Sequence, residues 1–262
     1  MPQDKILQVE DIVVSCGQKQ ILNHVSFDLE KGSVLAIVGE SGSGKTTLAK
    51  SILGILSSGC SITHGSIKYK NIYLQELNSK DYSKLYGKEL SSIFQNPGSY
   101  LNPIIKIGKQ FVETLSSCMH IDGNEALKIS ETVLKKTNLR DIPKILDSYP
   151  FELSGGMLQR VSIAMVFALN PALVIADEPT SALDVVSQKW VLDELFSLKE
   201  QSDSTLIIIT HSLSVASYIA DSVMVLHKGE MVEFGSKAQV LGSPKHPYTK
   251  ELISSAIYLL EQ

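Results

Sequence analysis

The sequence has few cysteines, no long apolar run and no excess of positive charge. Its 262 residues include only Cys16, Cys60 and Cys118, which are widely spaced and form no CxxC pair. An odd, scattered set of this kind is typical of a reducing compartment and gives no sign of a structural metal site. The formal net charge of −4 argues against a protein that binds nucleic acid by neutralising its phosphates.

Signals for membrane crossing and secretion are missing as well. The longest apolar stretches, such as LVIA and LIII, are far shorter than the ~20 residues of a membrane-spanning helix. The opening MPQDKILQ lacks a charged start followed by an apolar core, so we expect no signal peptide. Any link to a membrane is therefore expected to run through partner proteins. A hydrophobic fraction of 44% with 20% charged residues describes a globular protein that buries a sizeable core.

Short apolar runs separated by turns fill the first 96 residues and return after residue 170. They predict strands at 6–15, 20–29, 33–39, 64–71, 91–97, 172–177 and 205–210, and a hairpin at 222–235 that turns near Lys228 and Gly229. Helices are predicted at 45–53, 79–86, 185–201, 212–220 and 248–262. Residues 97–170 have helical spacing at 108–119 and 124–139, with a proline-bounded connector at 142–150.

This order predicts a single α/β domain that covers residues 1–262. Residues 1–96 and 171–262 are expected to form a parallel core with an N-terminal antiparallel β portion. Residues 97–170 are expected to form an inserted α-helical subdomain.

The stretch GESGSGKT, residues 39–46, matches the phosphate-loop pattern between an expected strand and an expected helix. Glycines let backbone N–H groups approach the phosphates, Lys45 reaches the β- and γ-phosphates of ATP, and the Thr46 hydroxyl binds Mg²⁺. A flexible glycine turn is the alternative, but strand, helix, lysine and threonine are all in place. The core is therefore predicted to be a P-loop NTPase (RecA-like) fold. Its predicted nucleotide-binding residues are Gly39, Ser41, Gly42, Ser43, Gly44, Lys45, Thr46 and Thr47.

Two further motifs carry chemistry. In LVIADE, residues 173–178, an apolar run delivers Asp177 to the Mg²⁺ region, and Glu178 stands beside it to polarise an attacking water. Without other motifs, such a run would indicate only a strand whose end reaches solvent. In a chain that also contains a phosphate loop, it indicates an ATPase. The signature segment LSGGMLQR, residues 153–160, places a serine and two glycines before a helix-forming stretch, which is how a chain builds an anion site at a helix start.

In order, these motifs resemble the nucleotide-binding subunits of ABC transporters along nearly the whole chain. The set comprises GESGSGKT, Gln95 in IFQNP, LSGGMLQR, LVIADE, SALD at 181–184 and His211 in IIITHS. The resemblance implies that two such domains meet head to tail, so that each ATP lies between one phosphate loop and the partner's signature segment. Ser154, Gly155 and Gly156 then bind the γ-phosphate of an ATP held by the partner.

The resemblance also assigns the remaining site residues. It implies that Gln95 senses Mg²⁺ and water, that Asp184 lies across the dimer seam, and that His211 contacts the γ-phosphate and holds the water with Glu178. Taken alone, His211 would be a half-buried residue at a strand end. Gln95 and Asp184 would be ordinary loop residues.

The chain departs from the family pattern at three positions. Cys16 stands where an aromatic residue usually stacks on adenine, so we expect weak stacking there and an apolar neighbour such as Val25 to pack against the base. Met157 replaces the commoner Gln of the signature segment, and Ser212 replaces the commoner Asp after His211. None of these changes removes a group that the chemistry needs, so an active ATPase is expected.

Met157 and the segment SPKHPYTKELISS, residues 243–255, resemble the ATPases of dipeptide, oligopeptide and nickel importers. The end at Gln262 and the lack of cysteine after Cys118 favour the nickel or nickel–metallophore branch over the peptide branch. The resemblance implies a second, different ABC ATPase subunit, two transmembrane permease subunits, an extracellular solute-binding protein reached indirectly, and no nucleic acid.

The implied location is the cytoplasmic face of the cell membrane, as a peripheral subunit in which residues 97 to about 150 receive a permease helix. One alternative is a soluble ABC ATPase of a cytosolic complex, such as the partner of the carbon–phosphorus lyase. Another is a small-molecule kinase, which would leave the signature segment and His211 without a role.

Overall fold

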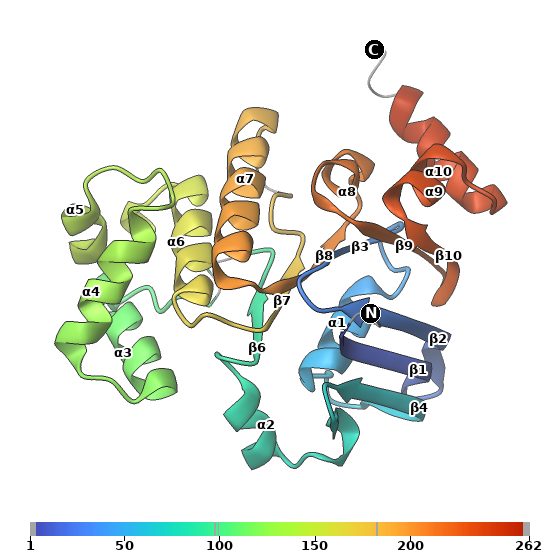
Figure 1. Cartoon of the computed structure of the whole chain (residues 1–262), viewed down its shortest axis with the longest axis horizontal. Helices are drawn as coiled ribbons and strands as arrows, with labels where there is room; N and C mark the ends of the chain where they lie inside the picture. The colour runs from blue at the N-terminus through green and yellow to red at the C-terminus, as the bar shows by residue number, and fades with distance from the viewer. Residues whose placement is uncertain (1–3, 97, 99, 182, 259–262) are drawn as a thin grey trace. The chain divides into compact units, whose positions relative to one another are not determined.

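A computed structural model of the chain describes residues 4–258 except 97, 99 and 182, and it divides into two compact units (Figure 1). The first unit comprises Met1–Lys84 and Thr205–Gln262, and the second comprises Leu85–Ser204. Pro97, where the predicted helical subdomain begins, and Ala182 of the SALD motif lie outside the described residues. The predicted domain boundaries remain a prediction.

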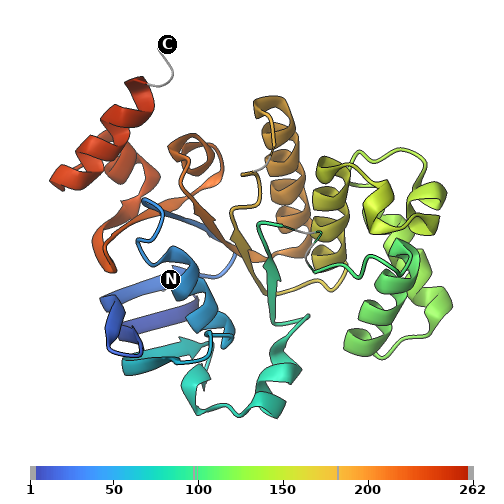
Figure 2. The ribbon, with the colours of Figure 1, turned by 180° about the vertical axis from the view of Figure 1, so that it is seen from behind.

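The first unit contains an antiparallel sheet in the order β2-β1-β4-β5. Its strands are β1 (Lys5–Cys16), β2 (Lys19–Glu30), β4 (Cys60–Tyr69) and β5 (Ile72–Tyr73). The second half of β2 alternates strictly between buried and exposed residues, because successive side chains of a strand point to opposite faces. Figures 1 and 2 show these strands in blue to teal, beside the helix α1 (Lys45–Leu53). The predicted N-terminal antiparallel portion is confirmed.

A disulfide joins two strands of this sheet. Cys16 of β1 and Cys60 of β4 face each other in the strand register, with their Cα atoms 4.0 Å apart. The backbone N–H of Gly17 donates to the carbonyl of Gly59 beside them, at 2.9 Å. The expectation of a reduced, unpaired set is therefore wrong for these two cysteines. Spacing along the sequence did not reveal a pair that strand register brings together from 44 positions apart.

The first unit also contains four strands in the order β10-β9-β3-β8. They are β3 (Val34–Val38), β8 (Thr205–Thr210), β9 (Ser222–His227) and β10 (Glu230–Ser236). β3 runs parallel to both β8 and β9, and every residue of β3 and β8 is buried, as expected for a parallel strand covered on both faces. The predicted hairpin is confirmed, with His227 opposite Glu230.

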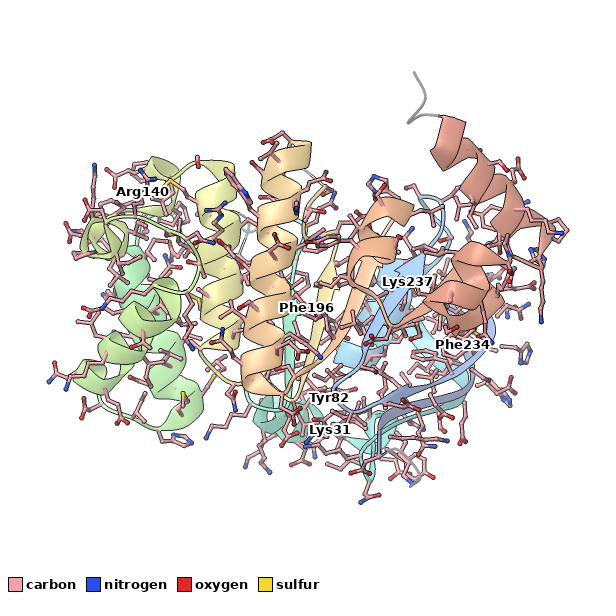
Figure 3. All side chains as sticks on the ribbon, turned by 45° about the horizontal axis from the view of Figure 1, so that its top comes forward. Lys31, Tyr82, Arg140, Phe196, Phe234 and Lys237 are labelled. Carbon is pink, nitrogen blue, oxygen red and sulfur yellow. A yellow bond between two sulfur atoms is a disulfide. The ribbon has the colours of Figure 1, made fainter. Side chains whose placement is uncertain are left out.

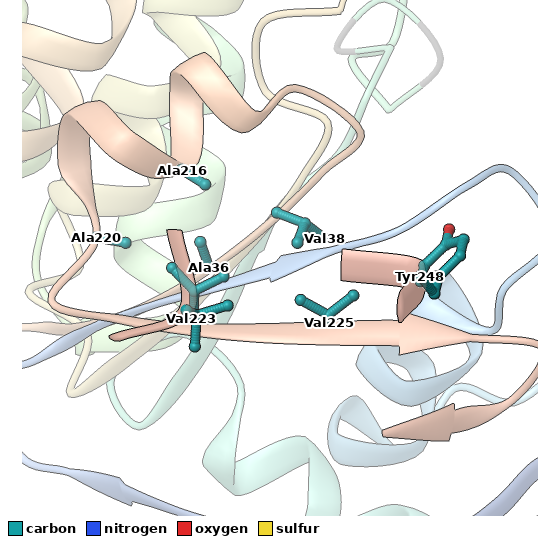
Figure 4. Packing of buried hydrophobic residues seen from close by; sticks show 8 residues of the cluster. Ala36, Val38, Ala216, Ala220, Val223, Val225 and Tyr248 are labelled. Atoms are coloured by element: carbon teal, nitrogen blue, oxygen red, sulfur yellow. The ribbon is translucent and has the colours of Figure 1, made fainter. Parts of the chain in front are cut away.

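Helices α8 (Leu213–Ile219), α9 (Lys237–Gly242) and α10 (Pro247–Tyr258) accompany these strands. Figure 4 shows the apolar cluster that they share with the strands, in which Ala216 and Tyr248 pack near Val38 and Val225. The sequence did not predict α9. Its signal is a capping box, in which the Ser236 hydroxyl accepts from the N–H of Gln239, and the Gln239 side chain accepts from the N–H of Ser236.

Two aromatic contacts help to hold the first unit together. The ring of Tyr82, in α2 (Ser79–Leu85), packs against Gly54. A Cβ on Gly54 would lie only 2.3 Å from Cζ of this ring. Gly54 ends α1 with φ at 66°, a conformation that glycine adopts without strain. Phe27 of β2 and Phe234 of β10 join the two sheets, with ring centroids 6.4 Å apart. Tyr82 and Phe234 are labelled in Figure 3.

In its described residues, the second unit combines a short parallel strand pair with several helices. The strands are β6 (Leu90–Ile93) and β7 (Leu173–Asp177). The helices are α3 (Ile107–Met119), α4 (Gly123–Leu134), α5 (Ile142–Asp147), α6 (Gly155–Phe167) and α7 (Val185–Ser202). The connector predicted at 142–150 is wrong, because it forms α5 and then a short 3₁₀ turn at Pro150–Glu152. Asp141 caps α5 by accepting from the N–H of Lys144.

Candidate active site

In the first unit, strand register brings the phosphate loop, residues 39–46, and His211 to one edge. Val38, the last residue of β3, pairs with Thr210, the last residue of β8. The strands are parallel, so Gly39 and His211 both follow at the carboxyl edge, where ligands of open α/β sheets bind. The side chain of His211 is exposed there. The structure thus brings together two parts of the predicted site that the sequence separates widely.

Lys45 opens α1 and is almost fully buried, with 7% of its surface exposed. Its Nζ donates to the carbonyl of Gly39 at 2.7 Å and to the carbonyl of Glu40 at 2.8 Å. The phosphate loop therefore surrounds the ammonium group of Lys45, and two of its backbone carbonyls accept hydrogen bonds from that group. Together with the N–H groups at the start of α1, this cation favours an anionic ligand.

The loop is braced from behind by the β9–β10 hairpin. A Cβ on Gly39 would stand 2.1 Å from the carbonyl oxygen of Leu226, and the N–H of Gly229 donates to the carbonyl of Ser43 at 2.9 Å. A Cβ on Gly44 would stand 2.7 Å from a methyl group of Leu22. Packing therefore requires a glycine at position 39, where a side chain would collide with a backbone carbonyl, whereas at Gly44 the positive φ of 106° favours glycine.

Other side chains of the loop suit an oxyanion. The Ser43 hydroxyl is buried and has no hydrogen-bond partner among the described residues. A buried donor of this kind is costly unless a ligand satisfies it, so its environment fits a bound phosphate. Ser41, Gly42 and Thr46 are exposed, whereas Thr47 is half-buried and its carbonyl accepts from Ser51.

In the second unit, the edge of the β6–β7 pair gathers three predicted residues. Ile93, at the end of β6, pairs with Ala176, the residue before Asp177. Gln95 therefore follows the carboxyl end of one strand, while Asp177 and Glu178 stand at the carboxyl end of the other. Gln95 is exposed, and both acids are half-buried.

Glu178 has a backbone conformation that is unusual for its type. Its φ is 50°, in the left-handed region, where residues other than glycine cost about 1–3 kcal/mol. Ser181 holds this conformation, because both its N–H and its hydroxyl donate to the carbonyl of Glu178, at 3.3 and 3.2 Å. Strain of this kind concentrates at functional sites, which agrees with the predicted role of Glu178.

The signature segment starts α6 and leaves its glycines open. The Ser154 hydroxyl accepts from the N–H of Met157 at 3.3 Å and so caps the helix. A Cβ on Gly155 would meet nothing within 4 Å, and one on Gly156 would meet only Leu183, at 3.9 Å. Ser154 and Gly155 are exposed. The site predicted for a γ-phosphate is therefore accessible from outside this unit.

A cavity of about 530 Å³ in the second unit connects several of these residues. Gln95, Gly155 and Ser181 line it together with Leu183, beside Asp184. Gln159 also lines it, and its buried Nε2 has no hydrogen-bond partner among the described residues. The sequence did not single out Gln159. Its position one helical turn after Gly155 was the signal that could have indicated it.

Asp184 and Ser212 have clear structural roles as helix caps. Asp184 accepts from the N–H groups of Val186 and Ser187 at 3.1 and 3.0 Å, and from the Ser187 hydroxyl at 2.6 Å. The hydrogen bond from the Ser187 hydroxyl, ahead of those from the backbone, holds the pKa of Asp184 below its usual value. Ser212 caps α8 through the N–H of Val215, so it supplies the acceptor that the commoner Asp would supply.

Arg160 fixes α6 to α7 in the second unit. Its guanidinium lies 5.5 Å from the ring centre of Trp190, and its Nε lies 3.7 Å from Oε2 of Glu194. Burial raises the pKa of Glu194 to about 7, despite the opposing effect of the Arg160 guanidinium. The sequence did not predict this buried acid.

The expected role of Val25 at the adenine is wrong. Val25 is fully buried in the antiparallel sheet, so it offers no surface to a base. Cys16 is engaged in the disulfide and is half-buried.

Comparison with known proteins identifies the family. The family described as "ABC transporter" matches residues 22–181, which is more than half of the chain. The chain belongs to this family. It is 38% identical to the dipeptide transport ATP-binding protein DppD of Lactococcus lactis over 97% of its own length and 74% of that protein. It is also 38% identical to the metal-staphylopine import system ATP-binding protein CntD of Staphylococcus aureus, over 90% of its own length and 86% of that protein.

A solved structure supports the same assignment. A dimeric ATP-binding cassette, MJ0796, bound to ADP and Pi in a post-hydrolysis state, superposes with a TM-score of 0.78 at 26% identity, over 88% of this chain and 98% of that one. The predicted P-loop NTPase fold is confirmed. This ABC protein is an ATP-hydrolysing subunit of an importer. Among its described residues, no helix is both long and apolar enough to cross a membrane.

Proposed function

We propose that this ABC subunit hydrolyses ATP with Mg²⁺ to power the uptake of nickel, a nickel–metallophore complex or a small peptide. The observation that carries the proposal is the presence of two phosphate-binding elements in one chain. One is the phosphate loop around the buried Lys45, and the other is the open helix start at Ser154–Gly156. The names of relatives from dipeptide transport and metal–staphylopine import support the choice of cargo.

The phosphate loop holds the triphosphate of ATP. Lys45 exchanges its two carbonyl partners for phosphate oxygens, and the backbone N–H groups of the loop and of the first turn of α1 face the same anion. The Ser43 hydroxyl gains a hydrogen-bond partner, which no described residue of the chain supplies. Ser41, Gly42, Thr46 and Thr47 complete the cradle.

The residues proposed for Mg²⁺ fit this ion chemically. Thr46, Gln95 and Asp177 offer a hydroxyl, an amide and a carboxylate oxygen, which are the hard donors that Mg²⁺ prefers. When bound, the ion neutralises charge on the β- and γ-phosphates.

Glu178 is the proposed general base. Its carboxylate accepts a proton from the water that attacks the γ-phosphate, and the strained backbone fixes where that carboxylate points. His211 and Gln95 position the water. The oxygen of the water bonds to phosphorus, and ADP leaves with the electrons of the broken bond.

The second phosphate element acts in a dimer. Ser154, Gly155 and Gly156 bind the γ-phosphate of an ATP held by the partner subunit, and Asp184 lies near the seam. ATP then favours the closed dimer because its γ-phosphate makes contacts only there, and hydrolysis removes that preference. We propose a heterodimer with a second ABC ATPase.

The remaining partners are two transmembrane permease subunits and, indirectly, an extracellular solute-binding protein. The subunit then lies at the cytoplasmic face of the cell membrane, where the helical insert from residue 97 to about residue 150 receives a helix of a permease. No nucleic acid takes part.

Purification of the tagged chain from gently solubilised native membranes tests the assembly. We expect two multi-span permeases and a second ATPase to copurify, and the genomically adjacent binding protein to bind nickel or dipeptides. Recovery of a soluble complex without permeases would refute transport and indicate a cytosolic ABC ATPase.

Glu178→Gln tests the chemistry. Turnover should fall at least about 100-fold while ATP binding persists and the dimer stays closed, because only proton transfer is lost. The matched control is Glu200→Gln on the exposed side of α7, which should hydrolyse ATP normally. Retained hydrolysis by Glu178→Gln would remove Glu178 as the base.

A further inference from the structure

The segment around HPYT, residues 246–249, singled out in the sequence, has no role in the proposed chemistry. In the structure it forms the start of α10 and lies against the strands that carry the phosphate loop. Tyr248 is 8% exposed and belongs to the same buried cluster as Val38, the last residue of β3 (Figure 4). The segment thus reaches the residue that directly precedes the phosphate loop.

The hydroxyl of Tyr248 contacts the loop itself. It accepts a hydrogen bond from the backbone N–H of Glu40, the second residue of the loop, at 3.2 Å. The carbonyl of the same residue accepts from Nζ of Lys45 at 2.8 Å. The backbone of Glu40 therefore connects Tyr248 on one side with the phosphate-binding lysine on the other.

Tyr248 is itself held firmly in place. Its ring centre lies 3.8 Å from that of His227, at the end of β9, and its N–H donates to Nδ1 of His246 at 3.2 Å. The N–H groups of Lys245 and His246 donate to the two carboxylate oxygens of Glu233 in β10, at 2.9 and 3.1 Å. These contacts anchor the start of α10 to the β9–β10 hairpin.

Packing alone does not account for a tyrosine at this position. A phenylalanine would fill the same apolar space, and burying a hydroxyl is unfavourable unless it finds a partner. Here the partner is a backbone N–H of the phosphate loop. This N–H belongs to the Gly39–Glu40 peptide, whose orientation also sets where the Gly39 carbonyl meets Nζ of Lys45. The hydroxyl therefore acts on the shape of the loop.

We propose that Tyr248 is a positioning residue for ATP binding, which holds the Gly39–Glu40 peptide in the orientation that the phosphate loop needs. The inference rests on the proposed function, since it deepens the ATP site. Without the hydroxyl, the loop spends less time in its binding conformation, and apparent affinity falls in proportion to that fraction. Through the same bond, a displacement of α10 by a partner protein would weaken ATP binding.

Tyr248→Phe in the full chain tests the proposal. We expect the Kd for ATP to rise about two- to tenfold, the range of one lost hydrogen bond, while kcat at saturating ATP changes by less than about twofold. The amide signal of Glu40 in a nitrogen–proton NMR spectrum should shift, and its hydrogen exchange should accelerate. A merely structural role would not move this signal selectively.

The matched control is Val240→Ala, at a buried residue of the same cluster that lies on α9. It should lower thermal stability through a cavity yet leave the Kd for ATP and the Glu40 amide unchanged. An unchanged Kd and Glu40 amide in Tyr248→Phe would overturn the inference alone. Failure of the wild-type chain to bind ATP would overturn the proposed function as well.

Discussion

The phosphate loop of the first unit and the signature segment of the second unit both place glycines at a helix start, but the surroundings of these glycines differ. A Cβ on Gly39 would collide with the carbonyl of Leu226 at 2.1 Å, whereas a Cβ on Gly155 would meet nothing within 4 Å. The glycine of the phosphate loop is needed by the chain's own packing. The signature glycine is not, which supports its proposed role in binding a ligand from outside its own unit.

The two regions also differ in what holds them. The phosphate loop is fixed by backbone contacts and lies in a chain segment closed by the Cys16–Cys60 disulfide. The signature helix is fixed by side chains, with Arg160 between Trp190 and the buried acid Glu194. The first region should therefore lose stability when a glycine gains a side chain or when the disulfide is reduced. The stability of the second region should depend on pH.

The largest expected effect is that of Gly39→Ala. Overpacking against a backbone carbonyl costs about 3 kcal/mol, and a positive φ of 154° adds about 2 kcal/mol for a residue with a side chain. Urea unfolding should show a loss of about 5 kcal/mol. The control is Gly42→Ala in the same loop, where a Cβ meets no atom within 4 Å and only the positive φ of 81° costs about 1–2 kcal/mol. Equal losses in the two variants would contradict the account of the close approach.

Reduction of the disulfide should have the second-largest effect on the free energy of unfolding. It opens a loop that spans 44 positions and contains β2, β3, the phosphate loop and α1, and the chain-entropy estimate for such a loop is about 4 kcal/mol. Cys16→Ser should unfold at correspondingly lower urea than the oxidised wild type. Cys118→Ser, at the half-buried free thiol, is the control and should match the wild type both before and after reduction, because it keeps the bridge, whereas Cys16→Ser should not respond to reductant. A wild type that is equally stable with and without reductant would refute the bridge.

Glu194 should make stability depend on pH. Its pKa is about 7 in the folded protein, against an ordinary value of 4.5, so the folded state binds more protons between these values. Its contribution to stability is therefore full below pH 4.5 and lost as pH rises through 7, by about 2.5 kcal/mol between pH 5 and pH 8. In Glu194→Gln, the free energy of unfolding measured with urea should no longer show this loss between pH 5 and pH 8. The exposed Glu200→Gln should still show it. Parallel pH profiles for wild type and Glu194→Gln would disprove the shift.

The smallest effect on stability is expected for Gly155→Ala. The added methyl group meets no atom, and alanine restricts the unfolded chain, so the unfolding free energy should change by less than about 0.5 kcal/mol. ATP turnover of the assembled transporter should nevertheless fall, because the methyl group occupies space proposed for the partner's γ-phosphate. Normal turnover would show that the open glycine is not a ligand site, and a large loss of stability would end the contrast with Gly39.

Much of the fold could be predicted because its signals are local. The buried runs of β3 and β8, the helix start after Ser154, and the turn at Gly229 each follow from a few adjacent residues. The connector at 142–150 failed because its prolines suggested a loop, although Pro143 stands in the first turn of α5, where proline is tolerated.

The predicted site residues sit at strand ends and helix starts, as their motifs indicated, and their chemical roles stay predictions. What escaped prediction depends on pairing between distant positions. The Cys16–Cys60 bridge follows from strand register, and the Tyr248–Glu40 hydrogen bond follows from where α10 docks. The raised pKa of Glu194 follows from its burial between helices. The apolar pattern of its helix does not indicate which polar residue will be buried.

The contacts that hold the phosphate loop also determine when, during synthesis of the chain, the loop can take its final shape. Leu226, Gly229 and Tyr248 are synthesised long after the loop, and Tyr248 follows Glu40 by 208 positions. A chain leaves the ribosome from its N-terminus, and contacts between distant positions form late in folding. A nascent chain that already displays GESGSGKT therefore lacks the backbone partners that shape it. ATP capture should begin only after the hairpin and α10 have been made, so unfinished chains do not compete for nucleotide.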